Sequence, residues 1–138
     1  MGTPALIGKV AEDGSFVAAR INYDGYPDTM GPRIAEIVAR DGLDKMFETL
    51  FKYGEWSNLN YDRPEDSKWY KPRPEDKGHV TGYGLPYPPN DNRGLFRGKE
   101  ANLRDGADYA YLMHEDGTWT VWGYRGVIAD GVRSLNSV

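Results

Sequence analysis

The stretch Asn22-Tyr-Asp-Gly-Tyr-Pro-Asp-Thr-Met-Gly31 decides the fold, because a strand pattern ends in it and the first helical pattern begins in it. Asp24-Gly25 is a turn pair, and we expect Gly25 to adopt a positive φ, which glycine does without a Cβ clash. Pro27 restricts Tyr26 to an extended conformation, so the chain leaves the strand as it passes Tyr26. The stretch therefore predicts a junction between a sheet and a helical layer.

Helical periodicity follows from residue 28 to residue 53. Asp28 can cap the first helix, and Gly31-Pro32 offers a second start with proline at the first helical position. Asp41-Gly42 ends the first helix with its glycine and can cap the second with its aspartate, and Gly54 ends the second. The apolar positions of both helices predict core side chains, and these are Met30, Ile34, Ile37, Val38, Leu43, Met46, Phe47, Leu50 and Phe51.

Two β-hairpins flank the helices along the chain. Residues 5–22 alternate around Asp13-Gly14, and residues 108–124 alternate around Asp116-Gly117. An aspartate-glycine pair between such runs is the strongest short hairpin signal. The two turn sequences also read alike, as good hairpin turns do.

The turn type decides which side chains share a face of each hairpin. With a two-residue turn, Val10 faces Val17 in the first hairpin. In the second hairpin a two-residue turn places Tyr109 and Tyr111 on one face with Trp122, which we call the aromatic shelf. A one-residue slip would exchange the faces, so this interpretation depends on the turn.

Residues 55–107 predict a long Pro-rich loop. They contain six of the nine prolines, so no long helix or central strand is expected there. Residues 79–83 are typical of one short edge strand. Residues 125–138 predict a polar tail with a few apolar anchors.

These patterns predict one α+β domain over residues 1–138. We expect an antiparallel sheet of four or five strands in ββααββ order, with two short helices packed on one face. A chain of 138 residues is long enough for a single core.

Composition argues against several classes of function. The chain has no cysteine, which removes disulfides and thiolate chemistry and suits a cytoplasmic protein. The apolar run at residues 5–7 is far too short for a signal peptide, and no run is long enough to span a membrane. The net charge of −4 argues against a nucleic-acid partner.

No catalytic group, metal site or cofactor site stands out. The only histidines are His79 and His114, and neither lies in a nucleophile context or at a metal-ligand spacing. Carboxylates are numerous, and a pair of them could hydrolyse a substrate if one had a raised pKa. We therefore keep a carboxylate-dependent hydrolase as a third reading and expect a binding protein rather than an enzyme.

Two surfaces are candidates for binding. Tryptophan, tyrosine and arginine dominate protein–protein hot spots, and they are frequent in the Pro-rich loop and on the aromatic shelf. The expected partner-binding residues are Trp69, Tyr70, Arg73, Tyr83, Tyr87, Tyr109, Tyr111 and Trp122. The alternative is a small ligand, for example a nucleotide signal sequestered beside Asp24, Tyr26 and Asp28. Self-association into a homo-oligomer stays open.

The chain resembles a family of small proteins encoded in bacteriophage and prophage genomes. The resemblance is carried by Tyr23-Asp-Gly-Tyr-Pro27 with the following Gly31, by Trp56, and by Tyr109-Ala-Tyr-Leu-Met with Trp119-Thr-Val. It covers roughly residues 5–56 and 108–124, and the middle of the chain departs from the family. The resemblance implies a phage accessory protein that acts in the bacterial cytoplasm on a host or defence component.

Overall fold

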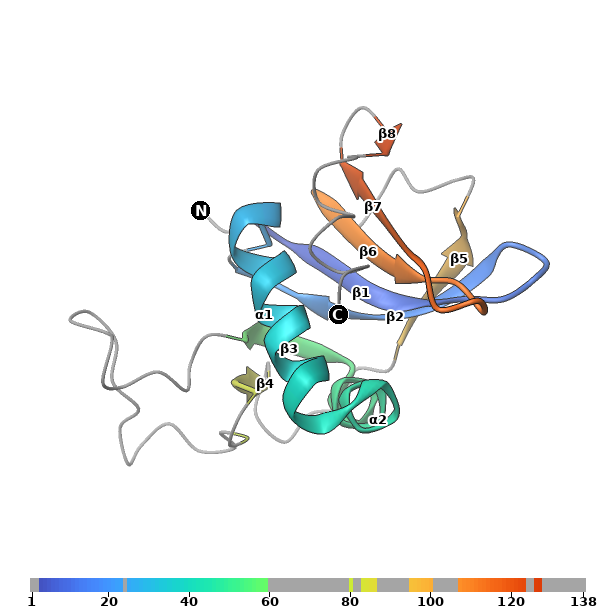
Figure 1. Cartoon of the computed structure of the whole chain (residues 1–138). Coiled ribbons are helices and arrows are strands. Elements are labelled where there is room, and N and C mark those ends of the chain that lie inside the picture. Colours follow the sequence, from blue (N-terminus) through green and yellow to red (C-terminus); the bar gives the residue numbers. More distant parts are fainter. Residues whose placement is uncertain are drawn as a thin grey trace.

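The chain adopts an α+β fold with a mixed sheet and two helices (Figure 1). The computed structural model describes residues 3–23, 25–59, 80, 83–86, 95–100, 107–123 and 126–127. Eight strands form the sheet, and two of them have only two residues each. In chain order the elements are β1 Ala5–Val10, β2 Ser15–Ile21, α1 Pro27–Asp41, α2 Leu43–Tyr53, β3 Glu55–Asn58, β4 Leu85–Pro86, β5 Phe96–Lys99, β6 Tyr109–Met113, β7 Trp119–Gly123 and β8 Gly126–Val127.

The predicted α+β class is confirmed, but the prediction of an antiparallel sheet is wrong for two strand pairs. The strand order is β4-β3-β2-β1-β6-β7-β8, and β5 pairs with β2. β1 pairs with β6 in parallel, and β2 pairs with β3 in parallel. β1 is buried at five of its six positions, as in a central strand with a neighbour on each side. Hairpin signals specify only the antiparallel neighbour that is local in sequence.

The predicted loop over residues 55–107 is also wrong in part, because it contains β3, β4 and β5. Trp56 of β3 is fully buried. Pro86 lies in β4, at one end of the strand order, where a missing N–H removes no bond from a central ladder. In place of a strand at residues 79–83, the described residues show one bridge between Val80 and Gly84.

Both hairpins have a three-residue turn instead of the predicted two-residue turn. In the first, the N–H of Ala11 donates to the carbonyl of Ser15, and the N–H of Gly14 donates to the carbonyl of Ala11. His114, Gly117 and Thr118 repeat this pattern. Gly14 has φ 85° and Gly117 has φ 88°, as in a type I turn that is followed by a left-handed glycine.

The longer turn shifts each hairpin by one residue and exchanges the predicted partners. Val10 faces Phe16, not Val17. Tyr111 faces Val121, and Trp122 faces Ala110. Tyr111 therefore lies in the core on the helix side of the sheet, whereas Trp122 packs against the core on the other side. The predicted aromatic shelf does not exist as one face.

The two helices cover one face of the sheet (Figure 1) and supply six of the sixteen buried side chains in the core on that side. Of the nine predicted core residues, six are buried, and Val38, Leu43 and Phe51 are partly buried against them. Gly42 and Gly54 end the helices at φ 87° and 81°, as predicted.

The predicted helix starts need correction. α1 starts at Pro27, and Tyr26 is its N-cap residue in an extended conformation (φ −59°, ψ 143°). Asp28 is therefore inside the first turn, and Pro32 is inside the helix rather than at a second start. Gly42, not Asp41, is the N-cap residue of α2.

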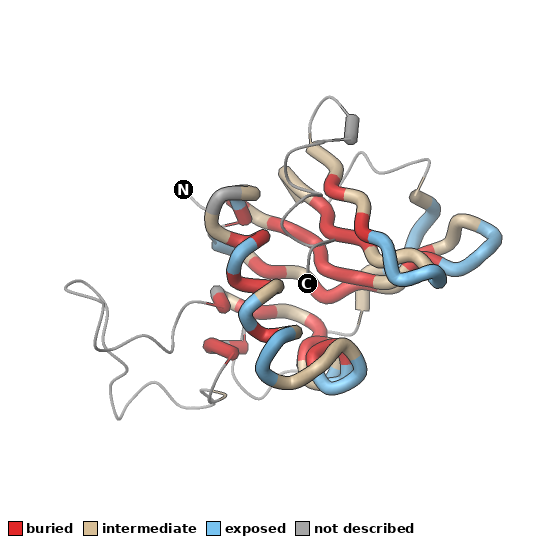
Figure 2. Tube along the Cα trace, in the orientation of Figure 1, coloured by how far each residue is buried: buried red, intermediate tan, exposed pale blue. Residues whose placement is uncertain are grey.

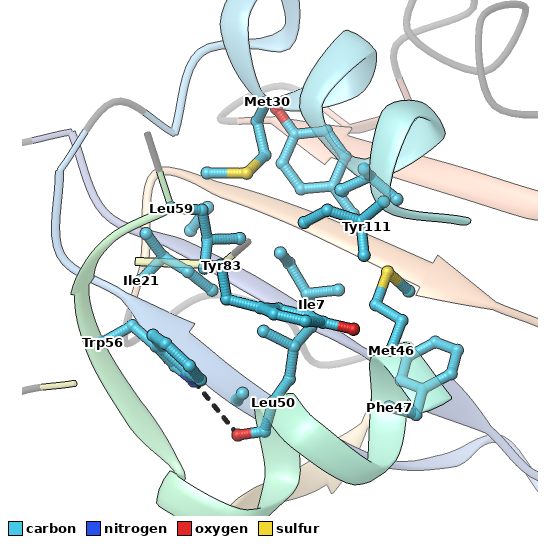
Figure 3. Packing of buried hydrophobic residues seen from close by; sticks show 14 of the residues in the cluster. Ile7, Ile21, Met30, Met46, Phe47, Leu50, Trp56, Leu59, Tyr83 and Tyr111 are labelled. Carbon is cyan, nitrogen blue, oxygen red and sulfur yellow. Dashed lines mark hydrogen bonds between the residues drawn. The ribbon is translucent and has the colours of Figure 1, made fainter. Parts of the chain in front are cut away.

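β1 is buried along almost all of its length and β2 at four of its seven positions, while the hairpin tips are exposed (Figure 2). In the core below the helices, the indole N–H of Trp56 donates to the carbonyl of Leu50 at 3.1 Å (Figure 3). A second, smaller core lies on the opposite face, where Glu100 follows β5 and accepts a hydrogen bond from Trp122 of β7 at 3.0 Å. None of the described helices is long and apolar enough to cross a membrane.

Candidate partner-binding site

Tyr23 and Tyr26 lie on the chain between β2 and α1, and the ring of Tyr109 in β6 lies beside that of Tyr26. We call these three residues the tyrosine junction. Tyr23 is 48% exposed and Tyr26 is 52% exposed, unlike the buried aromatic side chains of the core. The half-buried ring of Tyr109 in β6 lies 6.2 Å from the ring of Tyr26, centroid to centroid. The structure thus brings together one residue from each of the two predicted binding surfaces.

The backbone of the tyrosine junction is hydrogen-bonded to β3, to β6 and to Thr3 just before β1. The N–H of Tyr23 donates to the carbonyl of Ser57 in β3 at 3.0 Å. The N–H of Gly25 donates to the carbonyl of Thr3, just before β1, at 2.8 Å. Its own carbonyl accepts from the hydroxyl of Tyr111 in β6 at 2.6 Å. The exposed rings therefore stand on a backbone with little freedom to move.

Position 25 requires glycine because neighbouring atoms lie too close for a Cβ, and not because its φ is positive. The expected positive φ is wrong, because Gly25 is not among the glycines with that geometry. A Cβ built on Gly25 would lie 2.5 Å from the carbonyl oxygen of Thr3 and 2.8 Å from the Cβ of Ala5. No real side chain tolerates such distances without a backbone shift, so the packed junction depends on glycine here.

The base of the Pro-rich segment lies on α1. We use the name Pro-rich segment for residues 60–79. The segment base consists of Leu59, directly before it, and Tyr83, four positions after its end, together with Arg33 and Asp41. Arg33 is 5% exposed. Its Nε donates to the carbonyl of Leu59 at 2.5 Å, and its Nη2 donates to the carbonyl of Tyr83 at 3.4 Å.

Asp41 anchors the other side of Tyr83. The hydroxyl of Tyr83 donates to Asp41 at 2.7 Å, and Arg40 donates two hydrogen bonds of 2.9 Å to the same carboxylate. The bonds from Arg40, and then the one from Tyr83, lower the pKa of Asp41 to about 2. Burial and the bond to Asp41 raise the pKa of Tyr83. Asp41 thus serves as a charged acceptor for Tyr83.

The tyrosine junction and the start of the Pro-rich segment lie at the same end of the sheet. β2 and β3 are parallel neighbours, with Arg20 opposite Glu55 and Ile21 opposite Trp56. Parallel strands end at the same edge, so the residues that follow β2 and those that follow β3 emerge together. The hydrogen bond from the N–H of Tyr23 to the carbonyl of Ser57 links the chain after β2 directly to β3.

The other predicted partner-binding residues have different places. Tyr111 is fully buried and Tyr83 is 3% exposed, so neither offers a surface to a partner in this fold. Trp122 is half-buried and donates to Glu100. Four predicted residues lie outside the described part of the chain: Trp69, Tyr70, Arg73 and Tyr87. Of the alternative ligand site, Tyr26 is exposed, whereas Asp24 and the side chain of Asp28 also lie outside it.

His79 lies outside the described part of the chain, and the contacts of His114 show no catalytic arrangement. His114 Nε2 lies 2.9 Å from the hydroxyl of Thr120 and 3.2 Å from a carboxylate oxygen of Glu100. No nucleophile–base–carboxylate relay is formed by these contacts, because Thr120 and Glu100 meet the same ring nitrogen. In the part of the chain that the structure describes, histidine and acidic side chains form no group able to hold a metal ion.

Sequence reasoning missed Arg33 and Tyr23. Arg33 lies three residues after Met30 and four before Ile37, so a cation on the apolar face of α1 was the available signal. A cation at such a position needs buried acceptors. Tyr23 carried no comparable signal, because its exposure follows from the parallel pairing of β2 with β3.

Comparison with protein-family models, with curated proteins and with solved structures gave no match to this chain.

Proposed function

We propose that this protein is a non-enzymatic binding protein of the phage accessory type, acting in the bacterial cytoplasm on a host or defence protein. The contact surface combines the tyrosine junction with Trp69, Tyr70 and Arg73 of the Pro-rich segment and with Tyr87. The observation that carries the proposal is the exposure of Tyr23 and Tyr26 on a backbone that is hydrogen-bonded to β3, to β6 and to Thr3 just before β1. The resemblance to phage proteins supports the choice of a host partner.

The tyrosine junction is preorganised for binding. A tyrosine ring supplies a large amphipathic contact area and has few rotatable bonds to order on binding. Because the backbone of Gly25 is already bonded to Thr3 and Tyr111, little further ordering is needed when a partner covers the rings. Two exposed rings on a backbone that is fixed in this way favour contact with a protein partner over a role in folding.

Two hollows lined by described residues do not suit the small-ligand alternative. The hollow beside Tyr109 and Trp122 has a volume of about 20 Å³, room for about one water molecule. A wider surface hollow of about 660 Å³ lies at the far end of α1 from Asp28. Its lining includes three acidic side chains and one lysine, which would repel a phosphate-bearing ligand.

Three of the described carboxylates are unsuited to the acid role that the hydrolase alternative requires. A carboxylic acid that donates a proton near neutral pH needs a raised pKa. Hydrogen bonds instead lower the pKa of Asp13, Asp41 and Asp116. These three carboxylates are suited to accepting hydrogen bonds rather than to acid catalysis.

The test is affinity capture from bacterial lysate, followed by titration of the purified captured protein. We expect the double variant Tyr23→Ser/Tyr26→Ser to weaken binding at least tenfold, while its melting temperature stays near that of the wild type. The matched control is Lys45→Ser/Glu48→Ser, which changes two exposed residues of α2. Equal affinity of the wild type and the tyrosine variant would refute this contact surface.

A further inference from the structure

Arg20 lies where the outer neighbour of β2 changes from one strand to another. β1 occupies one edge of β2 along residues 16–21. On the other edge, β5 pairs with β2 as far as Ala18, and β3 pairs with it from Arg20 onward. Side chains alternate between the two faces of a strand, so Arg20 lies on the same face as Ala18, which is the face of the smaller core. Its side chain therefore stands between the start of β5 and the start of β3.

Two neighbouring side chains fix the guanidinium of Arg20. Its Nε donates to the side-chain oxygen of Asn22 at 3.0 Å, and the side-chain nitrogen of Asn22 donates to Glu55 in β3 at 3.0 Å. On the side of β5, Cζ of Arg20 lies 5.9 Å from the centroid of the Phe96 ring, within the range of a cation–π contact. The guanidinium is thus held between the two strands through its Nε–H and its face.

The other donors of Arg20 have no acceptor among the described residues. Its Nη1 and Nη2 atoms form no hydrogen bond and no ion pair with any of them. Glu55 lies opposite Arg20 in the strand register, yet its carboxylate accepts from Asn22 and does not pair with the guanidinium. Arg20 is half-buried, so this end of it is within reach of solvent. The Nη1–Nη2 fork is therefore free on a side chain whose position is already fixed.

We propose that the free fork of Arg20 is a binding site for a carboxylate group. A guanidinium can donate two parallel N–H bonds to the two oxygens of a planar carboxylate, and this geometry adds specificity to the charge. Because Asn22 and Phe96 already hold the side chain, little rotamer freedom remains to be lost on binding. The site goes beyond the proposed contact surface. The carboxylate belongs to an acidic side chain of the partner or to a free small molecule, and the experiments below distinguish the two sources.

Glu55 and Asn22 should have opposite effects on this site. The charge of Glu55 is separated from Arg20 by the side-chain amide of Asn22 and repels a bound carboxylate. Glu55→Gln should remove the repulsion and keep an oxygen that accepts from Asn22. Asn22→Ala should release the guanidinium and leave its charge unchanged. The first variant should therefore bind a carboxylate more tightly than the wild type, and the second more weakly.

The first experiment titrates the full chain with sodium acetate, replacing sodium chloride at constant ionic strength, and follows the arginine Nε–H signals and the backbone N–H of residue 20 by NMR. We expect a saturable shift at Arg20 with a dissociation constant lower by about fivefold or more than at Arg97, the exposed arginine of β5. Arg20→Lys and Asn22→Ala should weaken acetate binding by about the same factor, and Glu55→Gln should strengthen it about twofold. Melting curves show that each variant is folded. Equal dissociation constants at Arg20 and Arg97 in the wild type, which needs no variant, would make Arg20 a solvated arginine only and overturn the proposal.

The second experiment measures the affinity of the purified captured partner for Arg20→Lys, with Arg97→Lys as the matched control. Binding that is weaker by about fivefold or more for Arg20→Lys alone assigns the carboxylate to the partner. Equal affinity of the wild type and both variants, with acetate bound at Arg20 in the first experiment, assigns the site to a free carboxylate. Acetate tests the site without any partner, so a failure of the tyrosine junction as a contact surface would leave this result standing.

Discussion

The hydroxyl of Tyr111 donates a hydrogen bond of 2.6 Å to the carbonyl of Gly25, 86 positions earlier in the chain. Tyr111 lies in β6, the parallel neighbour of β1, and Gly25 precedes the first turn of α1. The bond therefore links a non-local strand pair to the start of the helical layer. It is buried, so neither group has water as a substitute partner.

Tyr111→Phe should lower the free energy of unfolding by about 1–3 kcal/mol, because the Gly25 carbonyl then stays buried with one bond fewer. Urea unfolding followed by circular dichroism measures this change. Tyr109→Phe is the matched control, since that ring is half-buried in the same strand. If both substitutions had the same small effect, the Tyr111–Gly25 bond would not stabilise the fold.

Gly25→Ala should destabilise the fold by about 1–3 kcal/mol, because the new methyl group meets the backbone of Thr3 and the side chain of Ala5. Gly31→Ala is the control, and it should stabilise the fold rather than destabilise it. A Cβ on Gly31 meets no atom within 4 Å, and alanine is favoured over glycine in a helix by about 0.5–1 kcal/mol. Thermal melts of the two variants should therefore shift in opposite directions, and a shared direction would contradict this account.

Substitution of the hairpin glycines should destabilise the fold because of their positive φ, not because of steric contacts. Nothing lies within 4 Å of a Cβ on Gly14 or on Gly117, but both have a positive φ. Gly14→Ala and Gly117→Ala should each cost about 1–2 kcal/mol, which is the penalty for a left-handed L-residue. Gly14→Asn should cost less, because asparagine adopts this conformation more readily. Chemical unfolding of the three variants gives the ranking, and an asparagine variant as unstable as the alanine one would contradict it.

Local patterns predicted the elements of the fold better than their pairing. The helices, both hairpins and the two C-terminal glycine caps follow from spacing and turn chemistry within a few residues. The register failed by one residue because the same Asp-Gly pair fits either a two-residue turn or a longer turn with the glycine last. In the longer turn, Asp13 accepts hydrogen bonds from the N–H and hydroxyl of Ser15, and Asp116 does the same for Thr118.

The parallel pairs and most of the candidate site depend on non-local contacts. No local pattern states that β1 lies beside β6 or that β2 lies beside β3. The proximity of Tyr26 to Tyr109 and the exposure of Tyr23 follow from these pairings, so they could not be predicted. The buried Arg33 was visible as a charge on an apolar helix face, but its acceptors at Leu59 and Tyr83 were not.

The hydrogen bonds that Asp41 accepts from Arg40 and from Tyr83 should make stability depend on pH at both extremes. The pKa of Asp41 is about 2 in the fold against an ordinary 3.8, so its stabilising contribution is complete above pH 3.8 and is lost as the pH falls toward 2. The pKa of Tyr83 is raised above its ordinary 10, so its contribution is complete below pH 10 and is lost as the pH rises further.

Urea unfolding at a series of pH values checks both signs. Asp41→Asn should flatten the acid side of the stability profile, and Tyr83→Phe should flatten the alkaline side. A profile of Asp41→Asn that still fell as steeply as the wild type between pH 4 and pH 2 would place the acid sensitivity elsewhere.

Two tryptophans that flank the start of the Pro-rich segment should separate binding from folding. Trp56 is fully buried and bonded to Leu50, so Trp56→Ala should destabilise the fold by about 3–5 kcal/mol. On the proposed function, Trp69→Ala and Tyr70→Ala should leave the melting temperature almost unchanged and weaken partner binding roughly thirtyfold, the loss typical of an aromatic hot spot worth about 2 kcal/mol. Melting curves and titrations on the same preparations give both values. If Trp69→Ala instead lowered stability by several kcal/mol and lost binding only through unfolding, the segment would belong to the core and the contact surface would shrink to the tyrosine junction.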